Sequence, residues 1–287
     1  MRKAYFGLLF TIYVIALVIC CGIRGYLSLT GGINSVTGFY SGSSVLVSTF
    51  NLVLLGALLS WTVMTVMRRP EHEYPLPFKG ASVSVSLVLT AAAILLCAAA
   101  DAYELRDRMF YGIVPAPNTS FYLAVGISRL NLIMMWIKLA LAALAAIGLL
   151  LLALRCDIGR LAFLGVFPAL WQLAAIYDRY ISYMAPSQIS ENMLSILFMA
   201  IAPVFLLGQA RAICGFKQQN SRNLLVPAGL AVSLIGFTYA LPKLALLALD
   251  YIDLAFGWEL AFTIYSFVLA ICAIIYLVKY SRAIKIA

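Results

Sequence analysis

Eight apolar segments, each long enough to cross a lipid bilayer, recur along this chain of 287 residues. A helix needs about 20 mostly apolar residues to span the roughly 30 Å hydrocarbon core. Only helices and closed barrels satisfy their backbone hydrogen bonds in lipid, and these segments lack the alternation of barrel strands. We therefore expect an all-α fold, a polytopic transmembrane helix bundle that forms one domain over residues 1–287. The predicted spans are 4–23, 44–67, 81–100, 132–154, 161–183, 193–213, 224–249 and 254–278.

The first apolar segment resembles a signal peptide only in its basic start, at Arg2 and Lys3. Its run of about 20 residues exceeds the 7 to 15 of a signal-peptide core, and bulky Ile19 does not suit a cleavage site. We count it as a helix, which makes eight spans rather than seven. Hydrophobic residues form 64% of the chain and charged residues 11%, which leaves too little polar surface for a soluble domain.

The basic residues predict the orientation of the bundle. Thirteen of the 20 Lys and Arg residues lie at the N-terminus, in the loops 68–80, 155–160 and 211–223, and in the C-terminal tail. Five lie on the opposite side and two within spans. An excess of Lys and Arg marks the cytoplasmic side, so both termini are expected inside. The net charge of +9 is then an orientation signal, and we expect the lipid bilayer, not a nucleic acid, as partner.

Two predicted outer segments are longer than a simple connection requires. The first, 24–43, is rich in glycine, and the second, 101–131, carries five charges among its first eight residues. Long loops in compact proteins are commonly functional or mobile. Within the second, residues 121–130 have the composition of a short interfacial helix.

The first of these segments also carries a resemblance. It begins with Arg24, Gly25 and Tyr26 at a helix end and continues to Thr37–Gly38–Phe39–Tyr40. This stretch is similar to a pattern in uncharacterised polytopic membrane proteins of clostridia-like bacteria, in which an Arg is followed by an Asp-Pro-x-Thr-Gly-Phe/Tyr loop. Here Asn34 and Ser35 stand in place of Asp-Pro. The resemblance implies a bacterial source and no particular activity.

Catalytic and metal-binding motifs are missing from the sequence. Zinc chemistry needs several converging ligands, yet the only histidine is His72, in a loop expected in the cytoplasm. The chain has no GxxxxGK[ST] loop for ATP and no Gly-x-Gly-Asp motif of an aspartyl intramembrane protease. We therefore expect no metal site and no cofactor, and no catalytic residues are assigned, so a non-enzymatic protein is the leading expectation.

Several ionisable residues are predicted at a similar depth in the outer half of the bundle. A charge at the centre of a span costs about 2.5–3.5 kcal/mol on insertion scales, so such residues usually face the bundle interior or water. Together they form a candidate ligand-binding set, while the alternative is that the lysines extend to the headgroups and the acids pair with them there. For Lys138 we predict an interior position, with Glu259 as its acidic partner. The set is Arg24, Lys138, Asp178, Arg179, Lys243 and Glu259.

The six cysteines do not form an evident disulfide framework. Most are expected to act as small buried apolar residues. Because Cys97, Cys20 and Cys21 share the outer half of the bundle, a bridge from Cys97 to one of the other two stays open.

Three functions remain compatible with this sequence. The leading hypothesis is a non-enzymatic subunit or scaffold of an envelope assembly in the bacterial cytoplasmic membrane, with a membrane-protein partner. The alternative is a permease or small-molecule-binding membrane protein with a charged cavity in the outer half of the bilayer. A third is a lipid-modifying enzyme that uses Asp178 or Glu259 as a base.

Overall fold

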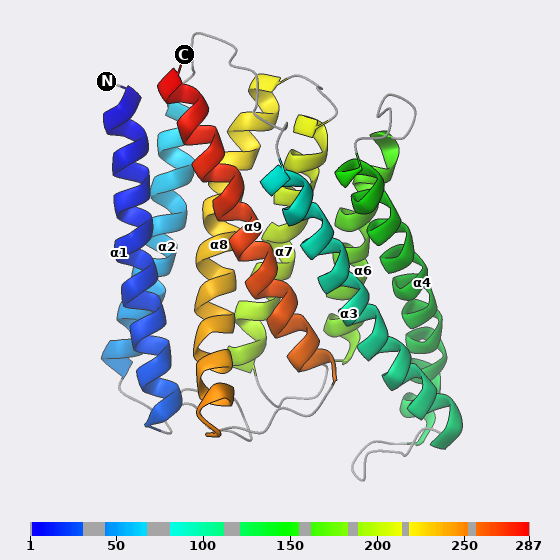
Figure 1. Ribbon diagram of the computed structural model, residues 1–287. Coiled ribbons are helices and arrows are strands. Elements are labelled where there is room, and N and C mark those ends of the chain that lie inside the picture. Colours follow the sequence, from blue (N-terminus) through cyan, green and yellow to red (C-terminus); the bar gives the residue numbers. More distant parts are fainter. Residues whose placement is uncertain are drawn as a thin grey trace.

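The chain folds into a bundle of helices (Figure 1). The computed structural model describes residues 2–30, 44–67, 81–111, 121–154, 162–182, 189–213, 218–251 and 257–286, and all regular structure in these residues is helical. In chain order the helices are α1 (Arg2–Leu29), α2 (Ser44–Met67), α3 (Ala81–Tyr111), α4 (Phe121–Ala153), the 3-10 helix η1 (Ala162–Val166), α6 (Phe167–Ser182), α7 (Ile189–Ile213), α8 (Gln218–Ala248) and α9 (Trp258–Ile286).

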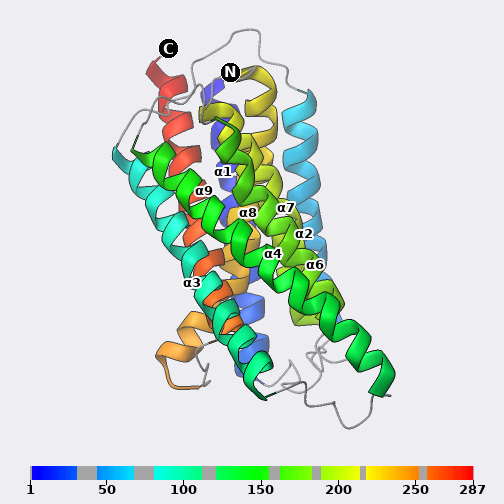
Figure 2. The ribbon, with the colours of Figure 1, turned by 90° about the vertical axis from the view of Figure 1, so that its right-hand side faces the viewer.

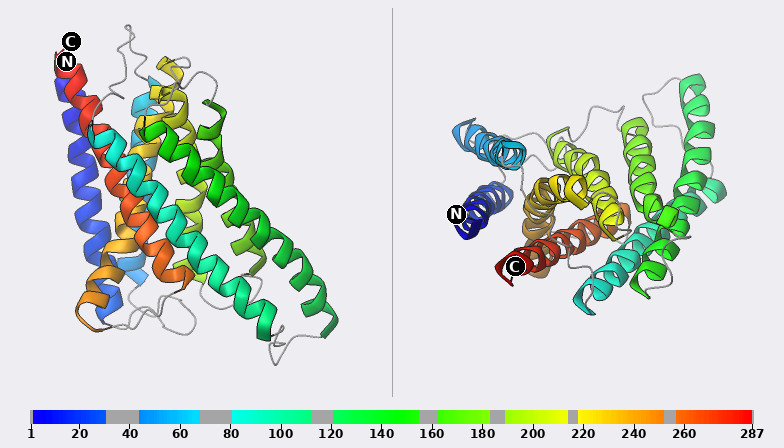
Figure 3. Two further views of the ribbon diagram at one scale, coloured as in Figure 1. Left: turned by 45° about the vertical axis from the view of Figure 1, so that its right-hand side comes forward. Right: turned by 90° about the horizontal axis from the view of Figure 1, so that it is seen from above.

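The number of membrane traverses follows from the lengths of these helices. Seven of the described helices contain an apolar stretch long enough to cross a membrane. A shorter apolar stretch, Phe163–Asp178, runs through η1 and α6. At about 2.0 Å per residue for a 3-10 helix and 1.5 Å for an α-helix, η1 and α6 together cover about 34 Å, enough for the hydrocarbon core. Both termini lie at the same end of the bundle, as an even number of traverses requires (Figures 1 and 3).

The interior of the bundle is mainly apolar, but many large apolar side chains are exposed and several charged ones are buried. Val45, Leu52 and Leu59 on α2 are 70%, 74% and 65% exposed, whereas Lys138 and Asp101 are each 1% exposed. Water favours apolar groups inside and charges outside. Lipid favours the opposite arrangement, because charges in hydrocarbon must find partners in the bundle interior. The prediction of an all-helical fold is confirmed for the described residues, and their seven long apolar helices are compatible with a multi-pass membrane bundle.

Helix α8 lies at the centre of the bundle and α2 at its edge. Of the residues in the apolar stretch, 78% are buried in α8 but only 22% in α2. Helix α8 packs against α1, α2, α7 and α9, while α9 also packs along α3. On the far side, α4 packs between α3 and α6, and Figure 3 shows these helices as a group beside the central pair.

Small residues allow the central helices to approach closely. A Cβ atom at Gly236 of α8 would lie 2.8 Å from the carbonyl oxygen of Ser266 in α9, so only glycine fits this crossing. In α4, Ala142 and Ala145 are fully buried. Close backbone approach is how helices associate in lipid, where burial of apolar surface supplies no driving force between them.

Helices α3 and α4 are longer than their predicted spans, and the prediction of a loop over 101–131 is wrong for most of that range. Helix α3 continues to Tyr111, and α4 begins at Phe121 rather than at residue 132. The segment 121–130, expected as a separate interfacial helix, is the start of α4. Hydropathy falls at Asp101, but Ala, Glu, Leu, Arg and Met after it are good helix formers, so the helix outlasts the apolar run. Similarly, α1 extends through Arg24 to Leu29, while residues 31–43 of the first predicted loop lie outside the described residues.

Candidate functional site

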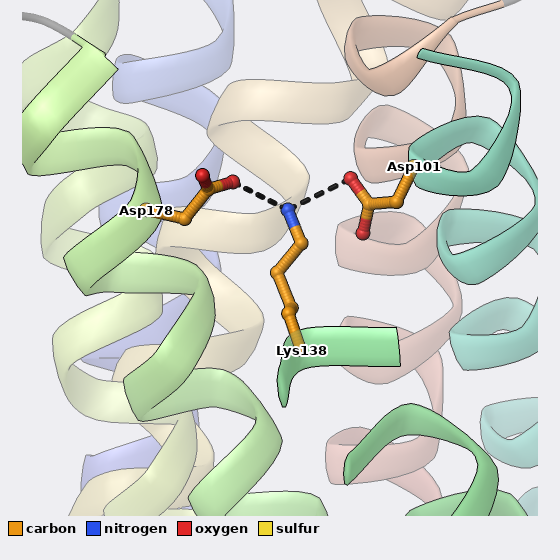
Figure 4. Close-up of polar contacts among 3 residues, drawn as sticks. All are labelled: Asp101, Lys138 and Asp178. Carbon is orange, nitrogen blue, oxygen red and sulfur yellow. Dashed lines mark hydrogen bonds and ion pairs between the residues drawn. The ribbon is translucent and has the colours of Figure 1, made fainter. Parts of the chain in front are cut away.

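The best-defined polar feature of the interior is a cluster of three ionisable residues from three helices (Figure 4). The ammonium of Lys138 on α4 donates a hydrogen bond to Asp178 Oδ2 on α6 at 2.5 Å, and it lies 2.7 Å from Asp101 Oδ1 on α3. The side chains of Lys138 and Asp101 are 1% exposed and that of Asp178 is 9% exposed. We call these three residues the ion cluster.

The Trp258 ring forms a further wall around the Lys138 ammonium. Lys138 Nζ lies over this ring at 4.2 Å from its centroid. A lysine ammonium has three N–H donors, and an aromatic face attracts a cation electrostatically. Two carboxylates and one aromatic face therefore surround the ammonium, and each of them comes from a different helix.

The helical periodicity of each segment explains why these side chains meet. On α6, Asp178 lies seven residues, or two turns, after Trp171, on the same face of the helix. On α9, Trp258 lies seven residues before Tyr265 on one face, and the Trp171 and Tyr265 rings meet edge to face at 5.1 Å. The Trp171–Tyr265 contact between α6 and α9 therefore lies about 10 Å from the ion cluster, toward the end of the bundle that carries both termini.

The cluster lies near one end of α6 and α9 but well inside α3 and α4. Asp178 is four residues from the end of α6, and Trp258 is the first residue of α9. By contrast, α3 continues about 15 Å beyond Asp101, and α4 begins about 25 Å before Lys138. Figure 3 shows the extended ends of α3 and α4 leaning away from α1, and Figure 2 shows α4 diverging from α8. The predicted span 132–154 would put Lys138 about 10 Å from the outer end of its helix, and this is wrong because α4 begins earlier than its apolar run.

Glu259 is not the partner of Lys138, which corrects our prediction. Its Oε1 accepts a hydrogen bond from Lys243 Nζ on α8 at 2.6 Å. The Glu259 side chain is 54% exposed and that of Lys243 is 10% exposed. Successive residues of a helix point about 100° apart, so once Trp258 faces Lys138 its neighbour Glu259 faces α8. The predicted interior position of Lys138 and its acidic partners are nevertheless observed.

The two ionic groups are connected by aromatic rings. Lys243 Nζ lies over the Tyr239 ring at 4.7 Å, and Tyr239 contacts Phe262 at 5.7 Å. Phe262 stacks on Trp258 at 5.6 Å with an interplanar angle of 15°. An aromatic row therefore has a lysine ammonium at each end.

The other two predicted site residues, Arg24 and Arg179, lie on α1 and α6. Arg24 is buried on α1, which packs against α2 and α8. Arg179 follows Asp178 on α6, but its side chain lies outside the described part of the structure. Of the six residues, Lys138 and Asp178 share one site and Lys243 and Glu259 form a second pair.

Sequence reasoning missed Asp101, because we assigned it to a loop. The signal that would have found it is its position four residues after Cys97, on the same face of a segment whose later residues favour helix. Cys97 is itself fully buried one turn from Asp101. Cys97, Cys20 and Cys21 form no disulfide bond in the structure, so neither of the possible bridges is present.

Other polar side-chain atoms are buried in the interior outside the ion cluster. Trp171 Nε1, the Tyr265 hydroxyl and both polar atoms of the Gln172 amide are buried without a hydrogen-bond partner among the described residues. Leaving such a group unsatisfied costs about 1–3 kcal/mol, so they are uncommon in folded proteins and point to a polar interior. No group of three or more His, Cys, Asp or Glu side chains in the described ranges is arranged to hold a metal ion.

Comparison of the chain with protein-family models, with curated proteins and with solved structures gives no match. The functional argument therefore depends on the geometry of the ion cluster and of the helices around it.

Proposed function

We propose that this protein is a permease or small-molecule-binding protein of the membrane, and that the ion cluster is its ligand-sensitive element. The observation that carries this proposal is the burial of Lys138 between carboxylates from two other helices. Ionisable residues inside a membrane bundle are expensive, and their usual role is to bind ions or substrates or to relay protons.

A purely structural role explains this cluster less well. The desolvation cost of a buried ion pair can exceed its Coulombic gain, so apolar residues of similar size often stabilise a fold equally well. An ionic link between α3, α4 and α6 differs from an apolar one because a proton or a charged ligand can break it. We infer that the cluster holds these helices in one of two arrangements, which is what alternating access to a site requires.

The alternative of a scaffold or assembly subunit depends on the exposed apolar surface of two helices. Helices α1 and α2 form a peripheral pair, with only 28% and 22% of their apolar stretches buried. In lipid such a face suits either acyl chains or the helices of a partner protein. This surface is compatible with both functions, whereas the buried ion cluster supports the permease.

Topology gives the proposed site an orientation. We propose that both termini lie in the cytoplasm, on the basis of the basic residues at the ends and in alternate connections. A cytoplasmic membrane of a bacterium is proposed as its location, because the segment from Arg24 to Tyr40 resembles a pattern in bacterial membrane proteins. The ion cluster then lies in the outer half of the membrane, between its centre and the extended ends of α3 and α4.

Thiol labelling tests the proposal with a probe that the chain already contains. Cys97 is fully buried one turn from Asp101, so a water-soluble thiol reagent reaches it only if the helices around the cluster separate. A variant that keeps Cys97 and carries Ala at the other five cysteines is treated in nanodiscs, which expose both membrane faces. The matched control keeps Cys20 alone, which is equally buried but lies on α1.

We expect Cys97 to react about tenfold faster than Cys20, because a permease populates an open state at the cluster and not at α1. Equal, very slow labelling of the two thiols would support the scaffold instead. Fast labelling of both would indicate general unfolding, and circular dichroism of the two variants distinguishes that case.

A further inference from the structure

The surroundings of Lys138 Nζ have the composition of an ammonium-binding site. Asp101 and Asp178 supply carboxylate oxygens at 2.7 and 2.5 Å, and Trp258 supplies a ring face at 4.2 Å. Charge-assisted hydrogen bonds to carboxylates, together with a cation over an aromatic ring, are the contacts by which proteins recognise amines. These three groups come from α3, α6 and α9, whereas the ammonium itself comes from α4.

The geometry selects against an anionic ligand at this position. The Lys138 ammonium contacts oxygen atoms of two carboxylates, so an anion that approached it would lie close to two negative charges. An incoming cation instead meets oxygen atoms and an aromatic face that already hold a cation. Like charges at about 4 Å repel by several kcal/mol in a partly buried site, which decides between the two classes of ligand.

We propose that Asp101, Asp178 and Trp258 form a binding site for a primary ammonium group, and that Lys138 is its tethered internal occupant. A ligand that carries a primary amine enters by displacing the Lys138 ammonium, which frees α4 from α3 and α6. This inference rests on the proposed function, because in the native protein the ligand reaches the site only when the helices separate.

Removal of the tether provides the test. The substitution Lys138→Ala deletes three carbons and the ammonium, which n-propylammonium replaces atom for atom. We expect n-propylammonium chloride at millimolar concentrations to raise the Tm of purified Lys138→Ala protein by about 5 °C, through mass action on the folded state. The response of the wild type is expected to be at least about fivefold smaller, because the tethered lysine competes at a high effective concentration.

Three comparisons decide whether the effect arises at this site. Propionate and n-propanol, which match the size but lack the ammonium, are expected to leave the Tm unchanged. The Lys138→Ala/Asp178→Asn protein is expected to lose the response to n-propylammonium. The matched control Lys243→Ala, which removes the more exposed ammonium of the second pair, is expected to behave as the wild type does.

The proposal is overturned if n-propylammonium stabilises Lys138→Ala no more than Lys243→Ala, or if propionate acts equally well. Should Lys138→Ala fail to fold, its folded yield after expression with and without n-propylammonium measures the same rescue, and an unchanged yield also overturns the proposal. The two hypotheses fail separately. If n-propylammonium stabilises Lys138→Ala but Cys97 is not labelled, the ammonium site is supported and the permease is not. If Cys97 is labelled but n-propylammonium has no effect, a permease for another class of ligand is supported and the ammonium site is not.

Discussion

Replacement of Lys138 by methionine should destabilise the protein strongly. Methionine keeps most of the volume of the lysine stem but removes the ammonium that contacts Asp101 and Asp178. Loss of one partner from a buried ion pair costs about 3–5 kcal/mol, because the remaining charge stays desolvated. With roughly 2–4 °C of Tm per kcal/mol for a domain of this size class, the expected decrease in Tm is on the order of 10 °C.

The neutral variant Lys138→Met/Asp101→Asn/Asp178→Asn separates the charge effect from packing. It removes all three charges at nearly constant shape, so we expect its free energy of unfolding to lie within about 2 kcal/mol of that of the wild type. The assay is the thermal unfolding of detergent-solubilised protein, followed by circular dichroism. Lys243→Met is the matched control. Because the side chain of its partner Glu259 is 54% exposed, this substitution should lower the free energy of unfolding by about 1 kcal/mol or less. A single Lys138→Met change that costs no more than Lys243→Met, or a triple variant worse than the single one, would refute the reasoning.

Three further predictions concern the topology and the helices outside the ion cluster. A reporter fused after the last residue should be active only as a cytoplasmic type, and an active extracytoplasmic reporter would show that the orientation is inverted. Asp250 adopts a φ of 56° where α8 ends, so Asp250→Gly should raise stability by about 1 kcal/mol in a thermal melt while Asp250→Ala should not. Gly236→Ala should lower the free energy of unfolding by about 1–3 kcal/mol, because its Cβ would lie 2.8 Å from the Ser266 carbonyl oxygen. The control Gly56→Ala, with no atom within 4 Å, should be neutral or stabilising, and similar Tm values for the two variants would contradict the close α8–α9 contact.

The sequence by itself determined the class of the protein and the approximate position of each traverse. Lipid imposes a requirement on every residue of a span, so the apolar character of a segment is a local property that can be read without knowledge of its neighbours. The same requirement predicted that Lys138 lies inside the bundle with an acidic partner, because an unpaired ammonium at that depth is costly. The start and end of the long helices were less accessible, since hydropathy marks where lipid ends and not where the helix stops, as Asp101 in α3 shows.

Only the tertiary structure decided which acid meets which lysine. Glu259 and Trp258 are adjacent in sequence, yet one binds Lys243 and the other covers Lys138, because a rotation of about 100° between neighbours directs them toward different helices. The rotation of each helix about its axis is fixed by packing against several others, through close crossings such as the one at Gly236. Partner choice in the ion cluster therefore depends on the relative rotation and depth of α3, α4, α6 and α9, which no single segment of the sequence contains.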